Sequence, residues 1–145
     1  MNPEDGPEEF LVRADERVRA ARAALGRRRT PDVVRFSQEA VELSLKSALR
    51  SAGIDYPKFH DVGFVLEDHR DKFPAWFRSA IPEMAELSHA LADRREAALY
   101  GSQKGVGPTR DVRDPRRARE FLQRATVVLG TVRKLVQGST SARSE

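Results

Sequence analysis

Hydrophobic residues recur every three or four positions along most of this 145-residue chain, which is the spacing that gives a helix one apolar face. The pattern predicts a first helix over residues 8–25, ended by Gly26, and a second that reaches about Ala52 and is ended by Gly53. Apolar residues of the second helix fall on more than one of its sides. Such a helix is expected either to be central in a bundle or to lie at an interface.

The second half of the chain predicts a short helix, a long helix and a final helix. The short helix covers 62–69 and can be capped by Asp61, the long one covers 82–100, and the last begins at Pro115. The inner stripe of the long helix contains Arg95, which is unusual for a charged residue. No stretch has the alternation of a strand, so the chain is expected to be all-α.

The length of the chain favours one domain with a single core. We expect a flexible acidic N-terminus over 1–7, a single helical domain over 8–137 and a disordered polar tail over 138–145. The absence of cysteine excludes disulfides and thiolate zinc sites. No apolar run approaches the roughly 20 residues of a membrane span, and the acidic start lacks the apolar core of a secretory signal. A cytoplasmic protein without membrane contact is therefore expected.

The charge of the chain is concentrated in one segment. The net charge is +4 and the isoelectric point is about 9.8, which fits either an anionic partner such as RNA or a nucleotide, or a merely soluble arginine-rich protein. Cations exceed anions most clearly between residues 101 and 119. The cations there are Lys104, Arg110, Arg113, Arg116, Arg117 and Arg119, and the anions are Asp111 and Asp114.

Polar residues stand at fixed spacing on the otherwise apolar second helix. Gln38, Ala40, Glu42 and Lys46 form a Q-x-A-x-E-x-x-x-K pattern. Glu42 and Lys46 are four residues apart in the orientation that favours a salt bridge along a helix. Gln38 is placed to bond to another helix.

The loop after this helix contains Gly53, Pro57, His60 and Asp61. Together with the Q-x-A-x-E-x-x-x-K pattern and the segment Arg94-Arg95 to Tyr100-Gly101, it resembles the HEPN family over roughly residues 8–137. The resemblance implies an up-and-down bundle of four to five helices, usually a homodimer. In this family many members are metal-independent ribonucleases that act as toxins or in defence. Others lack catalysis and bind nucleotides or pair with a minimal nucleotidyltransferase.

Catalytic members of the family carry R-x(4–6)-H near the end of the long penultimate helix. Histidine titrates near neutral pH and can move a proton, while arginine stabilises charge on phosphoryl oxygens. Here four residues lead from Arg95 to Tyr100, and no histidine follows. Tyrosine, whose ordinary pKa is about 10, is a poor base at neutral pH, although it can donate a hydrogen bond or stack on a base. Arg95 and Tyr100 are the candidate catalytic residues.

The leading hypothesis is a non-catalytic or weakly catalytic HEPN protein that binds a nucleotide or RNA and pairs with a minimal nucleotidyltransferase in a toxin–antitoxin or defence-type system. One alternative is a metal-independent endoribonuclease toxin that uses Arg95 with Tyr100 or His89. Another is a structural dimerisation module. The candidate nucleotide- or RNA-binding residues are Arg94, Arg95, Tyr100, Lys104, Arg110, Arg113, Arg116 and Arg117.

The polar motif residues also have structural interpretations. Arg95 can pair with Glu42 or another carboxylate inside the bundle, since a buried arginine needs a partner. His60 is expected to fix its loop, as part of a structural motif with Gln38, Glu42, Lys46 and Asp61. The three histidines are too scattered to suggest a zinc site, and no phosphate-binding glycine loop is present, so neither a metal nor a cofactor is expected.

Overall fold

The computed structural model describes residues 5–56, 58, 61–100 and 112–144, with side-chain surroundings described as far as Arg95 in the fifth helix and Gly138 in the last. No strand occurs among these residues, and the all-α prediction is confirmed. The elements are α1 (Pro7–Gly26), α2 (Thr30–Ser51), α3 (Gly63–Asp68), the 3₁₀ turn η1 (Arg70–Lys72), α4 (Ala75–Arg78), α5 (Ile81–Tyr100) and α7 (Pro115–Ser144).

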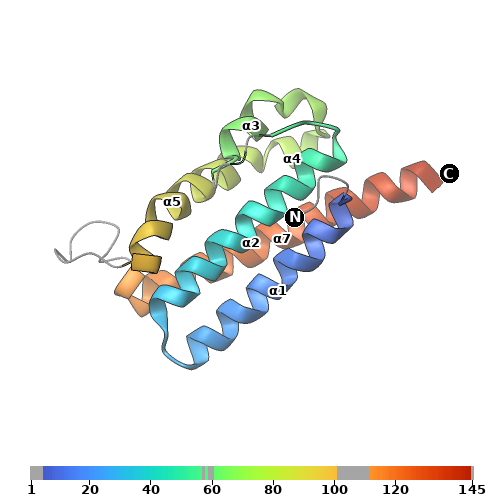
Figure 1. Cartoon of the computed structure of the whole chain (residues 1–145). Helices are drawn as coiled ribbons and strands as arrows, with labels where there is room; N and C mark the ends of the chain where they lie inside the picture. The colour runs from blue at the N-terminus through green and yellow to red at the C-terminus, as the bar shows by residue number, and fades with distance from the viewer. Residues whose placement is uncertain (1–4, 57, 59–60, 101–111, 145) are drawn as a thin grey trace.

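Four long helices alternate in direction and form an up-and-down bundle (Figure 1). The central helix is α2, which packs against α1, α5 and α7. Its apolar residues on several sides therefore indicate a central position in the bundle, one of the two possibilities that the sequence left open. The short elements α3, η1 and α4 connect α2 to α5 at one end of the bundle (Figure 1).

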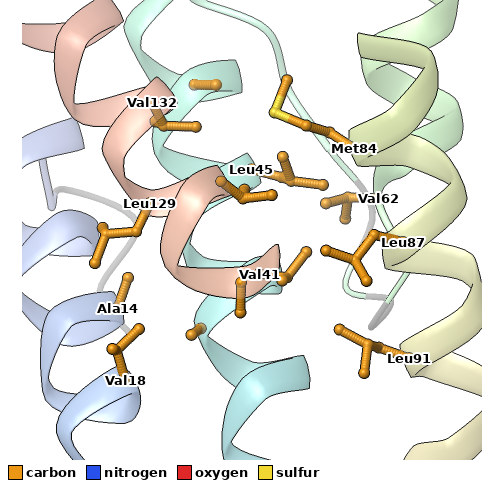
Figure 2. Close-up of a cluster of buried hydrophobic side chains, with 14 of the residues drawn as sticks. Ala14, Val18, Val41, Leu45, Val62, Met84, Leu87, Leu91, Leu129 and Val132 are labelled. Atoms are coloured by element: carbon orange, nitrogen blue, oxygen red, sulfur yellow. The ribbon is translucent and has the colours of Figure 1, made fainter. Parts of the chain in front are cut away.

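All four long helices contribute small and branched apolar side chains to one core (Figure 2). The alanines allow close approach of the helices, and the valines and leucines fill the space between them. Burial of each such leucine or valine contributes about 1.5–3 kcal/mol to stability. Core residues in Figure 2 include Ala14 and Val18 of α1, Val41 and Leu45 of α2, Leu87 and Leu91 of α5, and Leu129 and Val132 of α7.

Two glycines shape the segment after α2. Gly53 has a φ of 71°, a left-handed conformation that most other residues adopt only with strain. Gly63 begins α3 where the backbones of α3 and α5 meet, and a Cβ atom on it would lie 2.8 Å from the Cα atom of Ala85. A side chain at residue 63 is therefore excluded by close packing.

The end of α7 differs from the sequence prediction. Residues 138–144 were expected to be a disordered tail, but α7 continues through them to Ser144. The segment contains no proline, so nothing in it removes a backbone donor from the helix. The C-terminal end of α7 extends past the bundle (Figure 1).

The long helices all carry charged residues at short intervals. Among the described residues, none of the helices has an apolar stretch long enough to cross a membrane.

Candidate functional site

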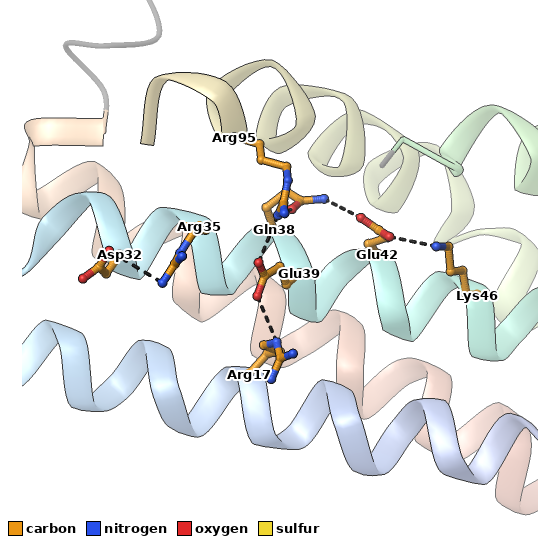
Figure 3. Close-up of polar contacts among 8 residues, drawn as sticks. All are labelled: Arg17, Asp32, Arg35, Gln38, Glu39, Glu42, Lys46 and Arg95. Atoms are coloured by element: carbon orange, nitrogen blue, oxygen red, sulfur yellow. Dashed lines mark hydrogen bonds and ion pairs between the residues drawn. The ribbon is translucent and has the colours of Figure 1, made fainter. Parts of the chain in front are cut away.

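A row of polar side chains follows one side of α2, in the space between α1 and α5 (Figure 3). Glu42 lies four residues after Gln38, three after Glu39 and four before Lys46, and Gln38 and Glu39 are adjacent. These spacings place the four side chains along one side of the helix. Arg17 reaches this row from α1, and α5 contributes one side chain from the other side. We call these side chains, together with Arg95, the polar seam.

Arg95 enters the polar seam from α5. Its Nη1 donates hydrogen bonds to Gln38 Oε1 at 2.7 Å and to Glu39 Oε2 at 3.0 Å. The bond from Gln38 to another helix, which the sequence suggested, is thereby found. The carboxylate that pairs with Arg95 is Glu39, whereas Glu42, the possible partner by helical spacing, pairs with Lys46.

Glu42 is bound along its own helix. Gln38 Nε2 donates to Glu42 Oε1 at 3.0 Å, and Lys46 Nζ lies 2.8 Å from Glu42 Oε2. The predicted salt bridge between Glu42 and Lys46 is confirmed, and both side chains are mostly shielded from water. The amide of Gln38 connects Arg95 to Glu42 through one hydrogen bond to each. Gln38 is only 2% exposed, so this connection lies inside the bundle.

Arg17 and Glu39 also belong to the seam, although neither is part of the Q-x-A-x-E-x-x-x-K pattern. Arg17 Nε lies 2.9 Å from Glu39 Oε1. Arg17, Glu39 and Arg95, with Glu42 and Leu43, line an open hollow of about 180 Å³. The only sequence signal for Glu39 was its position next to Gln38 on the same helix. Nothing in the sequence pattern linked Arg17 to it.

Arginines of α5 and α7 meet around one aromatic ring. The guanidinium carbon of Arg94 lies 5.4 Å from the centre of the Phe121 ring, and that of Arg117 lies 4.7 Å from it. Arg94 Nη1 also donates to the carbonyl of Ala90, and Arg117 Nη1 lies 2.9 Å from Glu120 Oε2. Two predicted binding residues from separate helices are thus neighbours, held by cation–π contacts.

The other predicted binding residues lie partly outside the described structure. Arg113 is exposed just before α7, and Arg116 is exposed in its first turn. Tyr100 is the last residue of α5, and its side chain is outside the described part. Lys104 and Arg110 are also outside it.

Asp61 fastens the loop after α2 to α5. Its Oδ1 accepts hydrogen bonds from the Gly63 amide at 3.2 Å and from Ser88 Oγ at 2.9 Å, and its Oδ2 lies 3.2 Å from His89 Nδ1. The predicted bond from Asp61 to the start of the short helix is therefore found. His60, its neighbour in the motif, lies outside the described residues.

His89 has contacts on both ring nitrogens. Its Nε2 lies 3.7 Å from Asp93 Oδ2, while its Nδ1 faces Asp61. The side chain is 70% exposed, so these contacts are on the surface. Within the described ranges, no group of three or more histidine and carboxylate side chains is arranged to hold a metal ion.

Comparison with known proteins agrees with this architecture. A family model described as the HEPN domain matches residues 7–135. No curated protein and no solved structure matches the chain. HEPN domains often dimerise and bind nucleotides or RNA, which supports a role related to nucleotides or RNA. With the all-α bundle and a match over most of its length, the chain belongs to the HEPN domain family.

Proposed function

We propose that this protein is a non-catalytic or weakly catalytic HEPN component that binds the phosphates of RNA or a nucleotide. The observation that carries the proposal is the convergence of Arg94 from α5 and Arg117 from α7 on the ring of Phe121. It gathers cations that the sequence separates by more than 20 positions. The planar fork of donors on a guanidinium group matches the geometry of phosphate oxygens.

The surroundings of that ring are also rich in arginine. Figure 1 shows the end of α1, the start of α2, the end of α5 and the start of α7 at the same end of the bundle. Arg22 of α1 and Arg119 of α7 line a single hollow of about 420 Å³ there. We call this region the basic end. Its arginines are Arg22, Arg27, Arg28, Arg29, Arg35, Arg94, Arg95, Arg113, Arg116, Arg117 and Arg119.

Carboxylates are fewer at the basic end than arginines. In these helix ends they are Asp32, Glu39, Asp93, Glu96, Asp114 and Glu120, and Glu39 pairs with Arg95. The excess of positive charge attracts a polyanion. Binding releases counterions from the polyanion, and this release becomes less favourable as salt is added, so the affinity falls with salt concentration.

Two features support weak or absent catalysis. The resemblance to the family's motif implies a proton-transferring histidine near the end of α5, and the chain has Tyr100 there and no histidine after it. Arg95, the arginine of the family's motif, is bonded to Gln38 and Glu39. An arginine neutralised by a carboxylate stabilises developing charge on a phosphoryl group less well than an unpaired one.

We also propose that the protein forms a homodimer and that it pairs with a minimal nucleotidyltransferase in a toxin–antitoxin or defence-type system. Family membership supports both, and each has a direct test. Sedimentation of the purified protein measures the dimer, and co-purification with the product of a neighbouring nucleotidyltransferase gene measures the partner.

RNA binding is tested by fluorescence anisotropy with a labelled short single-stranded RNA over a series of salt concentrations. The double variant Arg116→Gln/Arg117→Gln is expected to bind more weakly and with a shallower salt dependence, by about one unit of slope for each lost phosphate contact. Arg70→Gln/Lys72→Gln, in η1 at the other end of the bundle, removes the same number of charges and is the matched control. Equal losses in both variants would contradict a binding role for the basic end.

The alternative function is a metal-independent endoribonuclease, favoured by the helical continuation of α5 to Tyr100. Its test is cleavage of a mixed RNA pool in the presence of EDTA, beside Arg95→Ala. Cleavage that disappears in the variant would establish the ribonuclease and replace the binding proposal. Neither cleavage nor binding would leave the structural dimerisation module as the function.

A further inference from the structure

One carboxylate of α2 is held between arginines of two other helices. Glu39 Oε1 lies 2.9 Å from Arg17 Nε of α1, and Glu39 Oε2 lies 3.0 Å from Arg95 Nη1 of α5 (Figure 3). The two oxygens of a single carboxylate thus satisfy two guanidinium groups that approach from opposite sides. Two cations share one anion, so the three side chains keep one positive charge in excess.

The arrangement is accessible to solvent. The exposed fractions of the Arg17, Glu39 and Arg95 side chains are 37%, 21% and 22%, and all three line the open hollow of about 180 Å³. A water molecule takes about 30 Å³ in the liquid, so the hollow has room for a phosphate group. The ion pair of Arg17 with Glu39 is the more exposed of the two and contributes at most about 1 kcal/mol to stability.

The other carboxylate that lines the hollow, Glu42, does not bridge two arginines. It is bonded to Gln38 and Lys46 along α2, and Lys46 balances its charge. Glu39, by contrast, forms its ion pairs with the two arginines, one at each carboxylate oxygen.

Converging guanidinium groups suit a phosphate better than a carboxylate. A phosphate group offers more acceptor oxygens and, as a monoester, more negative charge, while its oxygens match the fork of donors on arginine. We propose that Arg17 and Arg95 form a phosphate-binding pair and that Glu39 is a resident anion which the phosphate of the ligand displaces. This inference rests on the proposed function for its ligand, and it adds a binding residue on α1 and an autoinhibitory carboxylate.

The test is a titration of the full-length protein with inorganic phosphate, adenosine 5′-monophosphate and a labelled short single-stranded RNA. Glu39→Gln keeps the shape of the side chain and removes its charge, so the affinity is expected to rise about tenfold. Arg17→Gln is expected to lower the affinity about tenfold. Arg19→Gln is the matched control, because Arg19 is an exposed α1 arginine paired with Asp15 and is expected to leave the affinity unchanged.

The three probes distinguish the source of the phosphate. A gain for the monophosphates alone assigns the pair to a nucleotide, and a gain for RNA assigns it to the phosphodiester backbone. Circular dichroism and urea unfolding establish whether each variant is folded. If Glu39→Gln or Arg17→Gln is not folded, Glu39→Asp or Arg17→Lys replaces it, because these changes keep the charge and alter only the reach of the side chain.

The outcomes separate this inference from the proposed function. Binding that is weakened by Arg116→Gln/Arg117→Gln but unchanged by both Glu39→Gln and Arg17→Gln would overturn the inference and leave the proposed function standing. Binding that appears only in Glu39→Gln would support the inference as autoinhibition. No binding by any folded variant would overturn both.

Discussion

Gln38 and Arg95 are 57 positions apart in the chain, yet the guanidinium of Arg95 donates to the side-chain oxygen of Gln38 at 2.7 Å. The amide of Gln38 turns its other end to Glu42 at 3.0 Å. One buried neutral side chain therefore orients a cation from α5 and an anion on α2. The polar seam depends on this residue for its geometry.

Replacement of Gln38 by leucine is expected to destabilise the protein. The change leaves Arg95 and Glu42 each without one partner in a mostly buried place, which costs about 1–3 kcal/mol. Urea unfolding followed by the fluorescence of the single tryptophan, Trp76, measures the effect. Gln123→Leu, at an exposed position of α7, is the control and is expected to change stability by no more than about 0.5 kcal/mol. Similar effects of the two variants would show that Gln38 does not hold the seam.

Asp61→Ala is expected to release the loop after α2 from α5. The change removes the acceptor for the Gly63 amide and for Ser88 Oγ, with a cost of about 1–3 kcal/mol. Hydrogen exchange at the Gly63 amide should become faster. Asp93→Ala is the control, because Asp93 contacts His89 only at 3.7 Å on the surface. Unchanged exchange at Gly63 in Asp61→Ala would show that the loop is held by other contacts.

Two glycine-to-alanine changes are expected to have opposite signs. Gly63→Ala forces a Cβ atom to within 2.8 Å of the Ala85 backbone, and overpacking of this kind costs about 1–3 kcal/mol. Gly130→Ala places a Cβ atom in open space within α7 and is expected to stabilise by about 0.5–1 kcal/mol. The midpoints of urea unfolding measure both. A stable Gly63→Ala variant would contradict the close approach of α3 and α5.

The central position of α2 makes its core residues sensitive to truncation. Leu45→Ala is expected to lower the free energy of unfolding by about 2–5 kcal/mol, because the side chain is fully buried and its removal leaves a cavity. Val127→Ala, on the exposed side of α7, should stay within about 0.5 kcal/mol of the parent. Thermal or urea denaturation compares them, and equal losses would place Leu45 outside the core.

Periodicity was sufficient to predict the long helices and the class of the fold. The apolar residues on several sides of α2 indicated a central or interface helix, and the four-residue spacing of Glu42 and Lys46 predicted their salt bridge. These features depend on spacing within one helix, which the sequence contains directly.

The partners of Arg95 and the role of Arg17 depend on which helix faces meet. Spacing places Glu39 and Glu42 on neighbouring parts of the same α2 surface, so it does not decide which of them Arg95 reaches. The contact of Arg17 with Glu39 requires the packing of α1 on α2. The helical continuation of α7 to Ser144 is not predicted from the sequence, because the polar composition of its last residues is typical of a disordered tail.

Under the proposed function, the basic end also affects how the protein approaches a polyanion before any contact is made. At physiological salt, charges act over about 8 Å, so the positive potential of this end reaches an approaching phosphate chain before the two are in contact. In that case the resulting torque would turn the molecule end-on and raise the rate of productive collisions. A protein that docks in this orientation leaves the projecting end of α7 directed away from the nucleic acid, where a second macromolecule can approach without competition.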